Sequence, residues 1–247
     1  MKILQELADR QPVHAEWRRK IHSFPELAYE EKATSQLVAD KLDSFGIPYM
    51  RGLGKTGIVA TIKSGKSDRA IGLRADMDAL PLQEKNSFSH RSQIDGKMHA
   101  CGHDGHTAIL LAAAEYLSNH RTFEGMVHLI FQPAEEGEAG AKAMMDDGLF
   151  DNFPMESVFA LHNWPGLPAG KMAMRKGPIM AAMDTFDITI YGKGGHAAIP
   201  HLVADPILAG SETVQSIQTI VSRNLRASDT AVVSVTQFHG GQAYNVI

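Results

Sequence analysis

The sequence of 247 residues is poor in cysteine, has no long apolar run and shows no strong excess of charge of either sign. Its one cysteine, Cys101, cannot form an internal disulfide, which excludes a disulfide-stapled secreted fold. The longest apolar stretch, residues 108–114, is far shorter than the roughly 18 residues that indicate a membrane span. The N-terminus is charged and lacks the apolar segment of a signal peptide, so we expect a cytoplasmic protein.

The charge balance excludes further classes of function. There are 24 Lys and Arg residues against 28 Asp and Glu, a net charge of −4. Without a basic run, we expect no binding to nucleic acid or to a membrane surface. Aromatic residues are few, with 2 Trp and 5 Tyr, whereas His occurs 12 times and directs attention to histidine chemistry. A hydrophobic content of 44% is enough for the core of one or two domains.

Apolar periodicity predicts an α/β fold for the first part of the chain. Helices are expected at residues 15–21, 30–45, 107–117 and 139–147, and strands at 57–63, 70–74, 125–131 and 158–161. Short apolar strands that alternate with helices are typical of a mainly parallel or mixed sheet covered on both faces. In such folds reactive side chains lie at the carboxyl ends of strands.

The pattern of apolar residues changes near Met183, from short continuous apolar runs to alternation of apolar and polar residues. Alternating strands are expected at 184–191 and 230–238, with an amphipathic helix at 205–221 between them. One polar face per strand indicates a second, half-exposed sheet. The sequence therefore predicts two domains, residues 1–183 and 184–247.

The segment H-A-C-G-H-D-G-H at 99–106 carries the strongest sign of chemistry. Thiol, imidazole and carboxylate side chains crowd together between Cys101 and His106, and two glycines let the loop bend. In an extended loop, Cys101 and His103 point the same way. Thiolate and imidazole suit Zn²⁺, Ni²⁺, Co²⁺ or Mn²⁺. In the alternative, Cys101 is a small buried hydrophobe and the histidines cap a helix.

Three other segments place polar side chains near predicted strand ends. Glu135 and Glu136 follow a strand and a proline turn, where one carboxylate would bind metal and the other move a proton, although a solvated loop also tolerates them. His162 follows in A-L-H-N-W, where a structural histidine is the alternative. The last segment, G-L-R-A-D-M-D-A-L-P, contributes Arg74, Asp76 and Asp78, for which turn capping is the alternative. Together these residues compose a site with room for two metals.

Seven motifs occur in order: R-R-K-I-H-S-F-P-E-L (18–27), G-L-R-A-D-M-D-A-L-P (72–81), M-H-A-C-G-H-D-G-H-T (98–107), F-Q-P-A-E-E-G (131–137), A-L-H-N-W-P (160–165), G-K-G-G-H-A-A-I-P-H (192–201) and G-G-Q-A-Y-N-V-I (240–247). With them the chain resembles the aminoacylase/carboxypeptidase family of dinuclear metallopeptidases. The resemblance is to its amidohydrolase branch, which includes hippurate hydrolases and N-acyl-amino-acid amidohydrolases, and it covers nearly the whole chain.

The resemblance implies a zinc-peptidase-like α/β catalytic domain with a mixed central sheet and an inserted ferredoxin-like lid or dimerisation domain. It also implies two divalent ions (Zn, Mn, Ni or Co). The positions that match metal ligands are Cys101, His103, Glu136 and His162. Glu135 matches the general base, and Asp76 an aspartate that orients a ligand. Arg74 stands where related peptidases carry a histidine ligand.

In the second domain, the resemblance implies contacts with a small N-acyl amino acid. His196 matches a histidine that reaches the reacting carbonyl, and Asn245 a polar residue near the substrate, so both would stabilise an oxyanion. A surface histidine in a glycine turn is the alternative for His196. Arg223 at a helix end is a candidate for a substrate carboxylate, or a solvated cation. The lid implies a homodimer or a higher homo-oligomer.

Family members continue beyond N-V-I and return to the catalytic domain with another histidine ligand, which no residue here matches. We therefore expect an incomplete lid and a C-terminally truncated chain. Two alternatives to an active N-acyl-amino-acid amidohydrolase follow. One is a catalytically incompetent fragment that keeps the fold. The other is a cytosolic dipeptidase, which Cys101 and Arg74 disfavour.

Overall fold

The computed structural model describes residues 4–247, which form two compact units. The first is Met1–Lys171 and the second Met172–Ile247, whereas the change of sequence pattern places the division near Met183. Within residues 4–247, no helix combines the length and the apolar character needed to cross a membrane.

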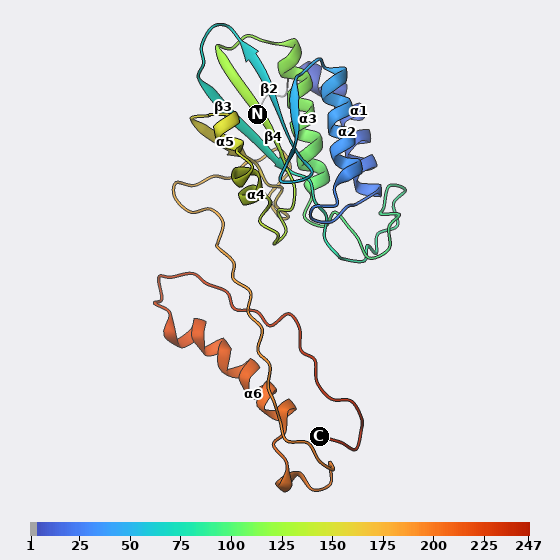
Figure 1. Ribbon diagram of the computed structural model, residues 1–247, viewed down its shortest axis with the longest axis vertical. Coiled ribbons are helices and arrows are strands. Elements are labelled where there is room, and N and C mark those ends of the chain that lie inside the picture. The colour runs from blue at the N-terminus through green and yellow to red at the C-terminus, as the bar shows by residue number, and fades with distance from the viewer. Residues whose placement is uncertain (1–3) are drawn as a thin grey trace. The chain divides into compact units, whose positions relative to one another are not determined.

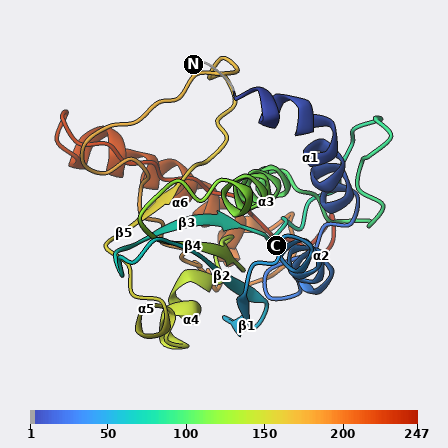
Figure 2. The ribbon, with the colours of Figure 1, turned by 90° about the horizontal axis from the view of Figure 1, so that it is seen from above.

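The first unit, which includes β2, β3 and β4 in Figure 1, is built on a mixed sheet. Its five strands have the order β1-β2-β4-β3-β5, and all of them are labelled in Figure 2. The strands are β1 (Tyr49–Leu53), β2 (Gly57–Ser64), β3 (Ala70–Asp76), β4 (Gly125–Gln132) and β5 (Ser157–Ala160). β3 pairs in parallel with β4 and with β5, while β2 is antiparallel to β1 and β4. The carboxyl ends of β3, β4 and β5 therefore meet at one edge of the sheet.

Helices cover both faces of this sheet, as the α/β prediction requires. They are α1 (Gln5–Ser23), α2 (Lys32–Ser44), α3 (His103–Asn119), α4 (Gly140–Asp146) and α5 (Leu149–Asn152). In Figure 2, α3 lies over one face, and α4 and α5 lie over the other. α3 starts four residues earlier than predicted, because Gly102 takes a left-handed conformation and begins the helix in place of an extended loop. His103 is therefore in its first turn.

The core follows the alternation of side chains along β2. Ile58, Ala60 and Ile62 point into a core cluster that also contains Leu111 of α3. Val59 points to the opposite face and packs in a second cluster with residues of α4 and α5. Since successive strand side chains face opposite sides, burial of both sets requires two covered faces. The predicted mixed α/β fold is confirmed for this unit.

The second unit contains α6 (Pro206–Thr219), a short 3₁₀ turn η1 (Pro200–Leu202) and a π-helical turn η2 (Ile220–Asn224). Asp205 caps α6 because its Oδ1 accepts from the N–H groups of Ile207 and Leu208.

The prediction of strands at 184–191 and 230–238 is wrong, because neither segment forms a strand in the structure. Within the described part of this unit, the β-type pairings are two isolated bridges, Lys193↔Ala204 and His196↔Val246. Alternation predicts which face a strand would bury. A strand, however, also needs a neighbouring backbone to satisfy its N–H and C=O groups, and these two segments do not pair.

Candidate metal centre

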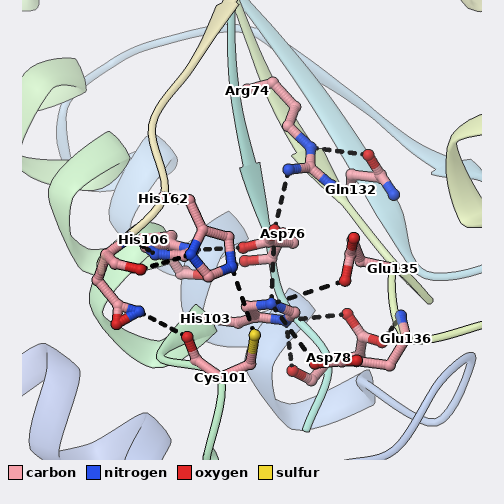
Figure 3. A network of polar contacts seen from close by, with 12 residues as sticks. Arg74, Asp76, Asp78, Cys101, His103, His106, Gln132, Glu135, Glu136 and His162 are labelled. Carbon is pink, nitrogen blue, oxygen red and sulfur yellow. Dashed lines mark hydrogen bonds and ion pairs between the residues drawn. The ribbon is translucent and has the colours of Figure 1, made fainter. Parts of the chain in front are cut away.

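Polar side chains from four segments converge beyond the carboxyl ends of β3, β4 and β5, beside the start of α3 (Figure 3). Asp76 and Asp78 belong to β3 and the residues after it, Glu135 and Glu136 follow β4, His162 follows β5, and Cys101 and His103 lie at the start of α3. The parallel pairing of the three strands brings these segments, far apart in the sequence, to one edge of the sheet.

His103 is at the centre of the cluster. Its Nδ1 donates to the main-chain oxygen of Asp78 at 2.8 Å, so its Nε2 carries the free lone pair. This Nε2 is buried and has no hydrogen-bond partner among the described residues, and neither does Oε1 of Glu136. Around Nε2 lie Asp76 Oδ2 at 3.5 Å, Glu136 Oε1 at 3.8 Å and Glu135 Oε2 at 3.9 Å. A cation would satisfy these polar atoms, whose burial without a partner is costly.

Cys101 and His162 extend the cluster on its other side. The Cys101 Sγ lies 3.3 Å from the His162 Nε2. The His162 Nδ1 donates to the main-chain oxygen of Asn163 at 2.6 Å, so the lone pair of its Nε2 faces the Cys101 thiol. The candidate ligand atoms lie within 4.8 Å of one another in each of three groups: Cys101 with His103 and His162, Asp76 with His103 and His106, and His103 with Glu135 and Glu136. Sulfur, nitrogen and oxygen donors of this kind fit zinc and similar divalent ions.

The electrostatics of the cluster also favour a cation. Burial and the neighbouring Glu136 carboxylate raise the pKa of the Cys101 thiol to about 12. Burial and the charge of Glu136 likewise raise the pKa of Glu135. A divalent ion would reverse the effect on the thiol and deprotonate it, so we expect metal binding to release a proton.

Asp76 is held ionised by two partners. Arg74 Nη1 donates to its Oδ2 at 2.9 Å, and His106 Nδ1 donates to its Oδ1 at 2.7 Å. Burial would raise the pKa of Asp76, but the hydrogen bond from His106 and the charge of Arg74 outweigh it and lower that pKa to about 2. The His106 Nε2 accepts from the Asn163 N–H at 2.9 Å, so both of its ring nitrogens are used within the protein. His106 therefore ties β3 to the segment after β5.

The sequence motifs predict no individual role for Asp78, His106 or Asp104, but in the structure all three form hydrogen bonds that hold the segments of the site together. Asp78 Oδ2 accepts from the Glu136 N–H at 2.9 Å while the Asp78 main chain holds His103. Asp104, in the first turn of α3, accepts from Arg18 and His22 of α1. All three lie within quoted motifs, but the sequence gives no sign of which partners they contact.

The residues expected from the second unit lie apart from this cluster in the sequence, and two of them, His196 and Asn245, lie in segments that pair with each other. His196 forms an isolated bridge with Val246, and the Ala197 N–H donates to the main-chain oxygen of Asn245 at 3.0 Å. Both His196 and Asn245 are exposed. Arg223 is exposed in the turn η2. Their contacts with a substrate stay predictions.

Gly102 offers a first test of the site's packing. It has φ of +92°, and a Cβ added to it would overlap the side-chain amide of Asn163, which itself donates to the Cys101 main-chain oxygen at 2.6 Å. We expect Gly102→Ala to lower the free energy of unfolding by about 2–4 kcal/mol, through backbone strain and this overlap. Chemical denaturation measures the loss.

Gly52→Ala is the matched control, because Gly52 has φ of +95° and nothing within 4 Å of the added Cβ. Its expected cost is about 1 kcal/mol, from backbone strain alone. Equal losses in the two variants would show that the contact with Asn163 does not matter.

Comparisons with known proteins identify a family to which this chain is similar. Residues 72–246 match peptidase family M20/M25/M40. The hippurate hydrolase of Campylobacter jejuni is 47% identical over 247 residues, covering 100% of this chain and 64% of that protein. The protein "IAA-amino acid hydrolase ILR1-like 2" of Arabidopsis thaliana is 48% identical, covering 93% of this chain and 52% of its own length. This chain thus spans roughly half to two thirds of these relatives.

Two solved structures are similar to this chain in fold as well as in sequence. A putative aminohydrolase from methicillin-resistant Staphylococcus aureus aligns with a TM-score of 0.77 at 36% identity, over 98% of this chain and 64% of that one. A dinuclear metal-binding peptidase of family M20 from Bacillus subtilis aligns with a TM-score of 0.70 at 32% identity, over 99% and 62%.

Proposed function

The chain belongs to peptidase family M20/M25/M40, and from this membership and the donor cluster we propose that it is a metal-dependent amidohydrolase that cleaves the amide bond of N-acyl amino acids. The observation that carries the proposal is the buried His103 Nε2, which has no hydrogen-bond partner among the described residues and faces three carboxylates beside Cys101 and His162.

In this proposal the metal ligands are Cys101, His103, Glu136 and His162, whose donor atoms are S, N and O. Two divalent ions held there would polarise the acyl carbonyl and make a water molecule more acidic. Asp76 orients its neighbours through the hydrogen bond with His106 and the contact with His103.

Glu135 is the proposed general base. It directly precedes the proposed ligand Glu136, and its side chain is 40% exposed, so it reaches both the cluster and the solvent where a substrate would enter. Its carboxylate accepts a proton from the attacking water and delivers it to the leaving amine nitrogen. Burial raises the pKa of Glu135 above its usual range, which favours uptake of a proton by this carboxylate.

We further propose that Met1–Lys171 supplies the catalytic part and Met172–Ile247 part of a lid that also mediates a homodimer or higher homo-oligomer. In the lid, His196 and Asn245 would hold the developing oxyanion, which the backbone pairing of their two exposed segments supports. Arg223 would bind the substrate carboxylate.

The test is an assay of the purified chain loaded with Zn²⁺ or Mn²⁺. We expect release of the free amino acid from hippurate or N-acetyl amino acids, its loss on chelation, and its recovery when metal is restored. A chain that binds two ions but hydrolyses none of these substrates contradicts the proposal and matches a catalytically incompetent fragment. Preferential cleavage of unmodified dipeptides favours a dipeptidase instead.

A further inference from the structure

Glu31 is a fully buried carboxylate outside the proposed metal and proton chemistry. It stands at the start of α2 with a relative exposure of 0%. Its Oε1 accepts from the Ala134 N–H at 2.8 Å, and its Oε2 accepts from the Thr56 hydroxyl at 2.6 Å. Burial of a carboxylate is tolerated only when hydrogen bonds of this kind compensate for lost hydration.

The group that Glu31 holds is the N–H of Ala134, the residue directly before Glu135. Ala134 has φ of +52°, a left-handed conformation that alanine rarely adopts, and its side chain is fully buried. The main-chain oxygen of Ala134 accepts from the Gly140 N–H at 2.9 Å. Both polar main-chain groups of this residue are therefore fixed, as a backbone in an unfavourable conformation requires.

The neighbouring Glu136 is held by Asp78, because its N–H donates to the Asp78 carboxylate, which also has a hydrogen bond with the backbone of Glu135. Farther along the loop, Tyr29 donates from its hydroxyl to the main-chain oxygen of Glu138 at 2.7 Å. The two adjacent glutamates thus share the buried carboxylate of Asp78, and Glu31 adds a separate anchor at Ala134, the residue before Glu135.

We propose that Glu31 is a positioning residue that sets the carboxylate of Glu135 by fixing Ala134, whereas Asp78 holds the metal-binding residues His103 and Glu136 together with the backbone of Glu135. This inference rests on the proposed function, in which Glu135 moves the proton and Glu136 and His103 bind metal. Loss of Glu31 should therefore reduce turnover and spare metal binding. Loss of Asp78 should reduce metal binding itself.

The experiment compares Glu31→Ala with Glu31→Gln and with the control Glu30→Gln. Glu30 is the adjacent carboxylate, but it is exposed and its side chain pairs with Lys97 at 2.8 Å. In Glu31→Ala we expect kcat to fall by about 100-fold, the loss that an ångström-scale displacement of a reacting group produces, with KM within about 3-fold and metal content unchanged. Glu31→Gln should recover most of this loss, since its oxygen can accept from Ala134 and its amide can donate to the Thr56 hydroxyl.

A second readout does not need turnover. Hydrogen exchange of the Ala134 amide should become at least about 10-fold faster in Glu31→Ala, because its hydrogen-bond acceptor is gone, and stay unchanged in Glu30→Gln. If the wild-type chain hydrolyses no substrate, the proposed function fails, and the exchange rate alone then decides whether Glu31 holds Ala134.

Three results would overturn the inference: unchanged exchange at Ala134, kcat in Glu31→Ala equal to that in Glu30→Gln, or loss of metal in proportion to the loss of kcat. Loss of metal in proportion to kcat would mean that Glu31 supports the structure of the whole site and does not specifically position Glu135. If Glu31→Ala does not fold, Glu31→Asp carries the test, because it keeps the charge but is one methylene too short to reach both partners. The same fall in kcat with retained metal is expected.

Discussion

Replacement of Glu135 by glutamine is expected to lower kcat by about 10²–10⁴-fold while the protein keeps its fold and its metal ions. The glutamine amide has the size of the carboxylate but cannot accept and release a proton. Glu135 is the more exposed of the paired glutamates, with 40% of its side chain accessible against 23% for Glu136, so its replacement leaves the buried donors in place.

Steady-state hydrolysis of hippurate or an N-acetyl amino acid measures the effect, with metal content determined on the same samples. Glu138→Gln is the control, since Glu138 is exposed in the same loop and its interaction with Tyr29 uses only the main-chain oxygen. A Glu135→Gln protein with both ions and most of its activity would exclude Glu135 as the proton carrier.

His103→Ala is expected to weaken binding of divalent ions by at least about 100-fold, so that the protein no longer retains two ions after desalting. The reason is geometric. His103 belongs to all three groups of donors, and its free Nε2 lies within 4 Å of carboxylate oxygens on both the β3 and the β4 side of the cluster. No other described side chain occupies this shared position, and turnover should fall with the metal.

Elemental analysis of the loaded and desalted protein, and titration with Zn²⁺, provide the measurement. His120→Gln is the matched control, because His120 follows the last residue of the same helix and is 38% exposed. If His103→Ala binds two ions with wild-type affinity, the cluster around Nε2 is not the metal centre.

Much of the first unit could be predicted because its strands and helices carry strong local patterns. The apolar runs of β2, β3 and β4 were expected within a few residues of their observed bounds. β1, with the sequence Y-M-R-G-L, was not predicted, since it has only a short edge-strand pattern with a glycine in it. The opposite error occurs at 184–191 and 230–238, where strands were predicted but do not form. Their alternating pattern is strong, but an alternating pattern does not provide a neighbouring strand to pair with.

The candidate site likewise contains some residues that the sequence identifies and others that it does not. Motif composition identified Cys101, His103, Glu135, Glu136 and His162 as candidates, and the structure brings these five side chains together. The residues that hold them were not identifiable. Glu30 and Glu31 are adjacent and chemically identical, and yet one is exposed with Lys97 while the other is buried against Ala134. Only the position of α2 relative to the loop after β4 decides between them.

By itself, the sequence determined the α/β class of the first unit, its family and the side chains available for metal binding, because these depend on local periodicity and on residue types in order. The tertiary structure decided which of those side chains remain free. His103 and His106 come from one motif, but His106 uses both ring nitrogens within the protein, whereas the Nε2 of His103 has no hydrogen-bond partner within residues 4–247. The difference comes from Asp76, Asp78 and Asn163, which only the pairing of β3, β4 and β5 brings beside α3.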